Sequence, residues 1–152
     1  LLVVVDFSIS SYYRRLYIFD LKSMKVILNT WTSHASKSDP EGNGYPTDFS
    51  NVSGTDKSSP GFFITGVQYD GKWGNSLRLH GIDGNLNSAV FDRGVVIHGW
   101  GMGPNGPTAT SQGCLMISYN ESTRFYGLPG DQPLVDYVID ELKGGAILYT
   151  HT

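Results

Sequence analysis

Residues 95–118, VVIHGWGMGPNGPTATSQGCLMIS, place two short apolar runs on either side of a loop rich in glycine, proline and threonine. The first run, residues 95–97, leads directly into His98, and the second, residues 115–117, begins directly after Cys114. Short apolar runs bounded by turn-forming residues are typical of buried strands. The stretch therefore predicts a strand, a loop and a second strand, with His98 leaving the first strand and Cys114 entering the second.

A loop that returns beside its own start brings Cys114 and His98 within hydrogen-bond reach of each other. This is the minimum for thiol catalysis, because the imidazole takes the proton and the thiolate attacks a carbonyl. Gly113 leaves room for a substrate backbone and lets peptide N–H groups turn toward a developing oxyanion. Cys114 is the only cysteine in the chain, so an internal disulfide is excluded and a free thiol needs an explanation. The bland alternatives are an inert buried cysteine and a histidine that caps a strand.

The same stretch resembles the catalytic motif of the murein L,D-transpeptidases, which is Ile-His-Gly, a loop, and then Ser-X-Gly-Cys. In the best-known branch X is histidine, whereas here X is Gln112. The chain looks like a second branch, the murein L,D-transpeptidase catalytic domain-like family, which does not keep that histidine. Further similar segments extend the resemblance from about residue 3 to about residue 118: VVVDFSISSYYRRLYIFDL, HASKSD, DFSN, SSPGFFITG, GKWGNSLRLHGID and LNSAVFDRGVVIHG.

The resemblance implies a cysteine enzyme that exchanges peptide bonds in peptidoglycan. Cys114 would be the nucleophile and His98 the general base, oriented by the main-chain carbonyl of Gly99. Gly113 and Cys114 would supply the N–H groups that bind the oxyanion. The pair would rest either as neutral thiol and imidazole or as thiolate and imidazolium, and the sequence leaves both open.

The implied reaction begins when Cys114 attacks the carbonyl of the L-centre of meso-diaminopimelate in a tetrapeptide stem. D-alanine leaves, a thioester forms, and an amine acceptor resolves it. The first alternative is an L,D-carboxypeptidase, in which water resolves the same thioester. Another is a catalytically silent wall-binding module, and the intact pair of His98 and Cys114 argues against it. An ordinary cysteine protease is weaker, because no Asn or Asp partner is evident.

Five more residues are candidates for substrate binding. Ser111 either braces the loop or touches substrate, and Gln112 forms hydrogen bonds but does not titrate. Arg78 and His80 alternate with leucines, so both point to the face opposite those leucines. If that face lines the pocket, Arg78 would hold a substrate carboxylate as a fork and His80 would replace the missing imidazole; a polar surface is the alternative. Trp100 is either a wall for the substrate stem or a core tryptophan.

Composition limits the remaining possibilities. The 152 residues suffice for one domain, 1–152, and 19 glycines with 9 tyrosines favour a β-rich, loop-rich fold. The net charge of −3 gives no basic footprint for nucleic acid, and no apolar run approaches a membrane span. Histidines without nearby carboxylates predict no zinc site, and no cofactor is expected. The expected binding partners are peptidoglycan stem peptides, and the protein is expected to be a monomer.

The expected fold is mainly β: an L,D-transpeptidase-like sandwich or flattened barrel with one or two short helices. The resemblance also implies export to the periplasm or cell envelope, with the signal peptide removed, because residues 1–5 are too short for one. The long polar segment 34–60 is expected to be ordered, with Phe49 as its anchor. The other expected elements are a β-rich start at 1–10, a hairpin of 14–20 and 25–32, strands at 61–67 and 77–80, a helical turn at 88–93, a helix at 133–143 and a strand at 145–151.

Overall fold

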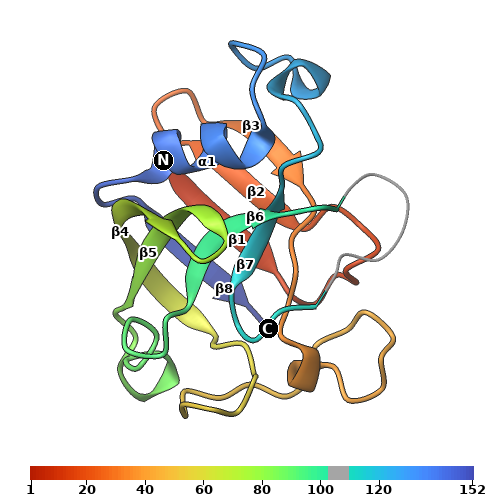
Figure 1. Ribbon diagram of the computed structural model, residues 1–152, viewed down its shortest axis with the longest axis vertical. Coiled ribbons are helices and arrows are strands. Elements are labelled where there is room, and N and C mark those ends of the chain that lie inside the picture. Colours follow the sequence, from red (N-terminus) through yellow and green to blue (C-terminus); the bar gives the residue numbers. More distant parts are fainter. Residues whose placement is uncertain (103–109) are drawn as a thin grey trace.

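The computed structural model describes residues 1–102 and 110–152, and Figure 1 shows a strongly curled sheet with one α-helix packed against it. Eight strands in these residues form one mixed sheet in the order β3-β2-β1-β8-β4-β5-β6-β7. The pairs β1–β8 and β6–β7 are parallel, and all other neighbours are antiparallel. The strands are β1 (Leu2–Asp6), β2 (Leu16–Asp20), β3 (Lys25–Thr30), β4 (Gly61–Gly71), β5 (Gly74–Gly81), β6 (Val96–Trp100), β7 (Leu115–Ser118) and β8 (Ile147–His151).

The helix α1 (Leu134–Leu142) covers part of the inner face of this sheet, against β5, β6 and β7. Leu134, Val138 and Leu142 recur at helical spacing and are almost fully buried. Pro133 precedes the helix, and Gly144 follows it with a φ of +87° that favours glycine. The helix expected from the sequence is therefore confirmed. Three short 3₁₀ helices also occur in the described residues: Ser36–Ser38, Gly84–Leu86 and Thr123–Tyr126.

The expectation of a mainly β fold is confirmed. Of the two forms expected, a sandwich or a flattened barrel, the curled sheet resembles the barrel. Strand β4 runs further than expected, to Gly71, because pairing with β5 resumes at Gln68 after an irregularity that follows Thr65. Residues 88–93 form hydrogen-bonded turns, in which the Arg93 N–H donates to the Ala89 carbonyl at 2.8 Å. They contain no regular helix, although the α-type bond of one turn is present.

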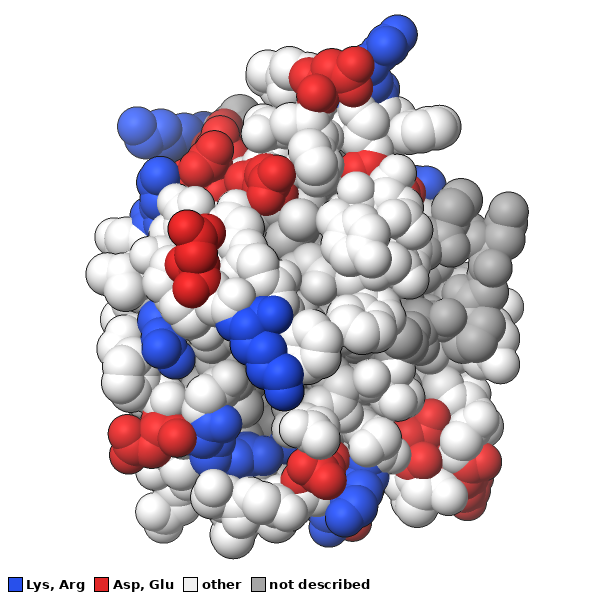
Figure 2. All heavy atoms as spheres, in the orientation of Figure 1, with Lys and Arg blue, Asp and Glu red and all other residues white. Residues whose placement is uncertain are grey.

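The long segment 34–60 packs on the body of the protein as expected. Phe49 is partly buried against the main core, and its ring stacks on Phe7 with centroids 5.9 Å apart. Acidic and basic side chains are interspersed over the described part of the face in Figure 2. None of the helices in residues 1–102 and 110–152 has the length and apolarity needed to cross a membrane.

Candidate active site

Strands β6 and β7 place Cys114 and His98 on the same face of the sheet. The two strands pair in parallel, with Ile97 opposite Leu115 and His98 opposite Met116. Successive side chains alternate between faces, so Ile97 and Leu115 enter the core while His98 and Cys114 share the other face. The sequence predicted that these two residues would lie close together, and the pairing of β6 with β7 puts them at neighbouring strands. The centre of the predicted loop, residues 103–109, lies outside the described residues.

The Cys114 thiol contacts the main chain at the start of β6. Its Sγ accepts the N–H of Val96 at 3.4 Å and lies 3.7 Å from the carbonyl oxygen of Gly94. No hydrogen bond joins Sγ to the His98 ring in the described part of the chain. Catalytic hydrogen bonds are often long before substrate binds, so this geometry is compatible with a thiol that turns toward His98.

His98 is buried, and its ring has a defined tautomer. Its Nδ1 lies 2.8 Å from the carbonyl oxygen of Gly99, which only accepts, so Nδ1 carries the proton and Nε2 is the basic nitrogen of the neutral ring. Burial lowers the pKa of His98, and the Gly99 carbonyl partly opposes that shift. The neutral ring therefore dominates at neutral pH, which is the state a general base requires.

One tryptophan stacks on the His98 ring, and a second packs against the first. Trp73 stacks on it, with centroids 5.7 Å apart and planes inclined by 17°, and Trp100 meets Trp73 edge-on at 5.3 Å. Trp100 is 37% exposed, so it is not a core residue. Sequence reasoning missed Trp73, whose only signal was an aromatic residue in the turn between β4 and β5.

Two hydroxyl groups hold the main chain around Cys114. Ser111 Oγ donates to the Cys114 carbonyl at 2.7 Å and accepts the Gly113 N–H at 3.1 Å. Ser33 Oγ also donates to the Cys114 carbonyl, at 3.0 Å, and accepts the Met116 N–H at 2.9 Å. The geometry therefore gives Ser111 the bracing role. Ser33, which lies 81 residues earlier in the chain, was missed.

The expected oxyanion donors differ in their availability. Gly113 has a φ of +133°, a conformation that favours glycine, and its N–H already donates to Ser111 Oγ. The Cys114 N–H has no acceptor among the residues that the structure describes. Among the described residues, the Cys114 N–H thus has no competing acceptor, whereas the Gly113 N–H must first leave Ser111.

Arg93 is a further charged group beside Cys114 that the sequence did not reveal. Its Nη1 donates to Ser50 O at 2.9 Å and Ser59 Oγ at 2.8 Å, and its Nη2 donates to Lys57 O at 2.7 Å. Burial raises the pKa of Cys114, while the Val96 N–H and the positive charge of Arg93 partly oppose the rise. Together with neutral His98, this favours a resting pair of thiol and imidazole.

Arg78 and His80 lie on the face opposite Leu77 and Leu79, as their alternation predicted, and the register with β6 makes this the face of His98 as well. Arg78 is opposite Val96, whose N–H contacts Cys114, so the three residues form a row across β5, β6 and the start of β7. The Arg78 guanidinium lies 4.1 Å from the Tyr69 ring centroid, and both Arg78 and His80 lie against the Phe91 ring. The Arg78 guanidinium thus lies toward β4, over the Tyr69 ring, whereas His80 is exposed and further along β5.

Gln112 is exposed, and its side chain forms no hydrogen bond with any described residue. It takes no part in the contacts that hold Cys114. Within residues 1–102 and 110–152, no group of three or more His, Cys, Asp or Glu side chains is arranged to hold a metal ion.

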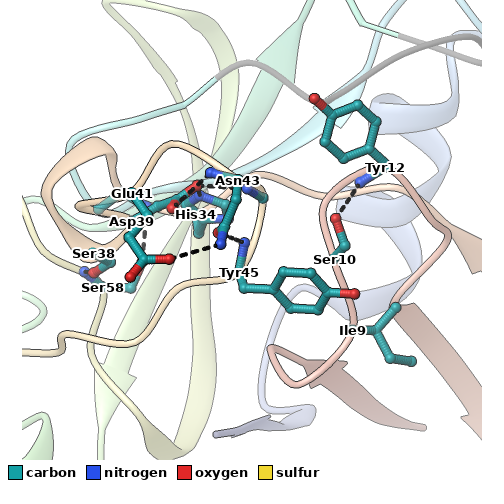
Figure 3. A network of polar contacts seen from close by, with 12 residues as sticks. Ile9, Ser10, Tyr12, His34, Ser38, Asp39, Glu41, Asn43, Tyr45 and Ser58 are labelled. Carbon is teal, nitrogen blue, oxygen red and sulfur yellow. Dashed lines mark hydrogen bonds and ion pairs between the residues drawn. The ribbon is translucent and has the colours of Figure 1, made fainter.

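A buried polar network supports the segment that leads to the site (Figure 3). Arg15 Nη2 donates to His34 Nδ1 at 2.8 Å, so the opposite nitrogen, Nε2, carries the proton toward Asp39 Oδ2 at 3.2 Å. Burial and the charge of Arg15 lower the pKa of His34 to about 4. His34 is therefore structural, and its carbonyl accepts the Ser111 N–H at 2.9 Å.

The sequence model of a family described as "L,D-transpeptidase catalytic domain" matches residues 1–151. None of the curated proteins matches the chain. The helical cell shape determining protein Pgp2 from Campylobacter jejuni, solved as a point mutant, is 13% identical with a TM-score of 0.56, over 98% of this chain and 46% of that one. An L,D-transpeptidase from Xylanimonas cellulosilytica is 12% identical with a TM-score of 0.51, over 99% and 59%. The chain thus spans about half the length of these proteins, and at such identities they show a shared fold.

Proposed function

The chain belongs to the L,D-transpeptidase catalytic domain family, and we propose that it is a peptidoglycan-modifying cysteine L,D-transpeptidase. The observation that carries the proposal is the placement of His98 and Cys114 on one face of the parallel pair β6–β7. The bond from His98 Nδ1 to the Gly99 carbonyl supports it further, because this bond makes Nε2 the proton acceptor.

In the proposed acylation, His98 Nε2 takes the thiol proton as Cys114 Sγ attacks the carbonyl of the diaminopimelate L-centre in a tetrapeptide stem. The negative charge on the carbonyl oxygen is bound by the Cys114 N–H, and by the Gly113 N–H once it leaves Ser111. The tetrahedral intermediate collapses when the protonated His98 gives its proton to the nitrogen of D-alanine. The C–N bond breaks, D-alanine leaves, and a thioester remains on Cys114.

In the proposed second half-reaction, an amine acceptor attacks the thioester while His98 takes its proton. The oxyanion forms in the same place, so the same N–H donors serve both steps. Collapse returns the proton to Sγ and releases the crosslinked peptide. A second diaminopimelate side chain supplies such an amine.

The other candidate residues would position the substrate. Arg78, in the row that includes Cys114, would bind a substrate carboxylate through its fork of N–H groups. Trp100 would form a wall for the peptide stem, and Ser111 would hold the loop. His80 and Gln112 are exposed and would contact only the outer parts of a bound stem.

We further propose that residues 1–152 act as a single domain and as a monomer in the cell envelope, where peptidoglycan lies. Size-exclusion chromatography with light scattering checks the monomer, and limited proteolysis checks the domain. A stable dimer, or cleavage into two resistant halves, would contradict these two points.

The function is tested with purified disaccharide-tetrapeptides, analysed by mass spectrometry after incubation with the wild-type protein, Cys114→Ala and His98→Gln. We expect crosslinked dimers from the wild type and none from Cys114→Ala. The His98→Gln rate should fall by about 10²–10⁴, the usual contribution of a general base. Ser53→Ala, at an exposed serine, is the control and should retain full activity.

Other results identify the alternatives. Tripeptide and free D-alanine without dimers would identify an L,D-carboxypeptidase, in which water resolves the thioester. Unchanged substrate with no acyl adduct on Cys114 would overturn the enzyme proposal in favour of a wall-binding module.

A further inference from the structure

A pocket of about 160 Å³ lies between the tip of the β4–β5 hairpin and the start of α1. Its apolar walls include Trp73, Tyr119 and Pro133, and its polar groups are Asn75 and Asp136. None of these residues belongs to the row formed by Arg78, Val96 and Cys114. The volume is below the roughly 300 Å³ at which pockets for whole small molecules begin, so the pocket suits a group the size of one side chain.

A chain of side-chain hydrogen bonds fixes the chemistry of Asp136. Lys143 Nζ donates to Gln68 Oε1 at 3.4 Å, Gln68 Nε2 donates to Asn75 Oδ1 at 2.7 Å, and Asn75 Nδ2 donates to Asp136 Oδ1 at 2.8 Å. An ammonium group only donates, so the orientation of each amide along this chain follows from Lys143. Every proton points toward Asp136, which is therefore the final acceptor.

The second carboxylate oxygen of Asp136, Oδ2, has no hydrogen-bond partner in the described residues. Asp136 also lies in the first turn of α1, at the positive end of the helix dipole. The pocket therefore presents a carboxylate oxygen as hydrogen-bond acceptor beside aromatic walls. A ligand group that complements it must donate hydrogen bonds and carry positive charge.

The aromatic walls favour the same kind of ligand. Trp73 is 47% exposed and Tyr119 is 54% exposed, so both rings are accessible to a ligand. The ammonium of Lys72 lies 5.1 Å from the centroid of the Trp73 ring, which is an intramolecular example of an alkylammonium over this side chain. Indole rings attract such cations through their quadrupole.

The pocket is also next to the catalytic base. Trp73 lines the pocket and stacks on the His98 ring, and Gly99 lines the pocket while its carbonyl holds His98 Nδ1. The Trp73 indole ring therefore separates a group bound in the pocket from the His98 ring.

We propose that this pocket binds the primary alkylammonium end of a ligand side chain, with Asp136 Oδ2 as its acceptor and Trp73 as its aromatic wall. A bound ammonium is protonated and not nucleophilic, so the pocket recognises an amine and does not activate it. If the proposed function holds, the ligand is the amine-bearing side chain of a stem peptide, and this last assignment alone depends on that function.

The test measures binding without turnover, in the Cys114→Ala background, by NMR of the indole N–H signals. The probe is 1,5-diaminopentane, and N-acetylglucosamine is the neutral comparison. We expect the diamine to shift the Trp73 signal, and Asp136→Asn to weaken its binding about tenfold or more, as expected for loss of a charged acceptor. Glu141→Gln removes the same charge from an exposed position of α1 and should leave the affinity unchanged.

Trp73→Leu is a second variant, which keeps Asp136 and removes the ring. Its binding of the diamine, measured by isothermal titration calorimetry because the Trp73 signal is absent, should also be weaker. Circular dichroism of each variant verifies the fold. The proposal is overturned if Asp136→Asn binds the diamine as tightly as the parent, or if only the neutral sugar shifts Trp73. The binding test measures no catalysis, so its result is independent of the activity assay. If the wild-type protein were inactive on tetrapeptides and the diamine still bound, the proposed function would be refuted and this inference would stand.

Discussion

Replacing Ser33 by alanine tests how the main chain around Cys114 is held. The fully buried Ser33 hydroxyl donates to the Cys114 carbonyl and accepts the Met116 N–H, at 3.0 and 2.9 Å. Alanine keeps Cβ and removes only the hydroxyl. The Cys114 carbonyl retains its bond from Ser111, whereas the buried Met116 N–H loses its partner. An unsatisfied buried donor costs about 1–3 kcal/mol, so we expect Ser33→Ala to lower the free energy of unfolding by about 2 kcal/mol.

Urea denaturation followed by circular dichroism measures this change. With a slope of about 2 kcal/mol per M, the midpoint should fall by about 1 M. The control is Ser53→Ala, at an exposed serine without a hydrogen bond in the described residues, which should stay within about 0.5 kcal/mol of the wild type. The rate of alkylation of Cys114 should change in Ser33→Ala and not in the control. Equal midpoints for the two variants would refute the reasoning.

Two further predictions concern the backbone before Cys114 and the buried network around His34. Gly113→Ala should destabilise the protein by about 1–3 kcal/mol in thermal unfolding, because φ is +133° and a Cβ would lie 3.2 Å from Val95 Cγ2. The control is Gly54→Ala, where φ is positive but the space is open, and it should cost only about 1 kcal/mol. Equal losses in the two variants would contradict the steric argument. The pKa of His34 is about 4 in the folded protein and 6.5 in the reference state, so the unfolded chain binds the proton first and stability falls as pH drops from 6.5 to 4. The loss should reach roughly 3 kcal/mol in urea titrations and should shrink in His34→Gln, whereas an equal loss in that variant would exclude His34 as the source.

The sequence predicted the features that depend on local periodicity. Alternation along β5 placed Arg78 on the face opposite Leu77 and Leu79, and both leucines are buried in the core. The two apolar runs around the motif predicted β6 and β7, and their parallel pairing then brings His98 and Cys114 to one face. These predictions succeed because a strand has a period of two whatever it packs against.

The contacts made by distant residues could not be predicted in this way. Ser33 reaches the Cys114 carbonyl through a hydrogen bond that spans 81 residues, and Arg93 is held by hydrogen bonds that span 34 to 43 residues. No spacing rule encodes such contacts. The fully buried Arg15 also gave no signal, because its burial depends on carbonyl acceptors from Ile9 and Thr32 that only the folded loop provides.

The hydroxyl groups along β7 have a consequence for the behaviour of the protein at high concentration. β7 is the last strand of the sheet, and an unpaired sheet edge is a template for strands of other chains. Here the Ser33 hydroxyl donates to the Cys114 carbonyl and accepts the Met116 N–H, and the Thr32 hydroxyl donates to the Met116 carbonyl at 3.0 Å. Side chains thus satisfy the edge that a neighbouring molecule would otherwise pair with. These three main-chain groups are therefore not available to a strand of another molecule, although in the described residues no further strand of the sheet covers β7.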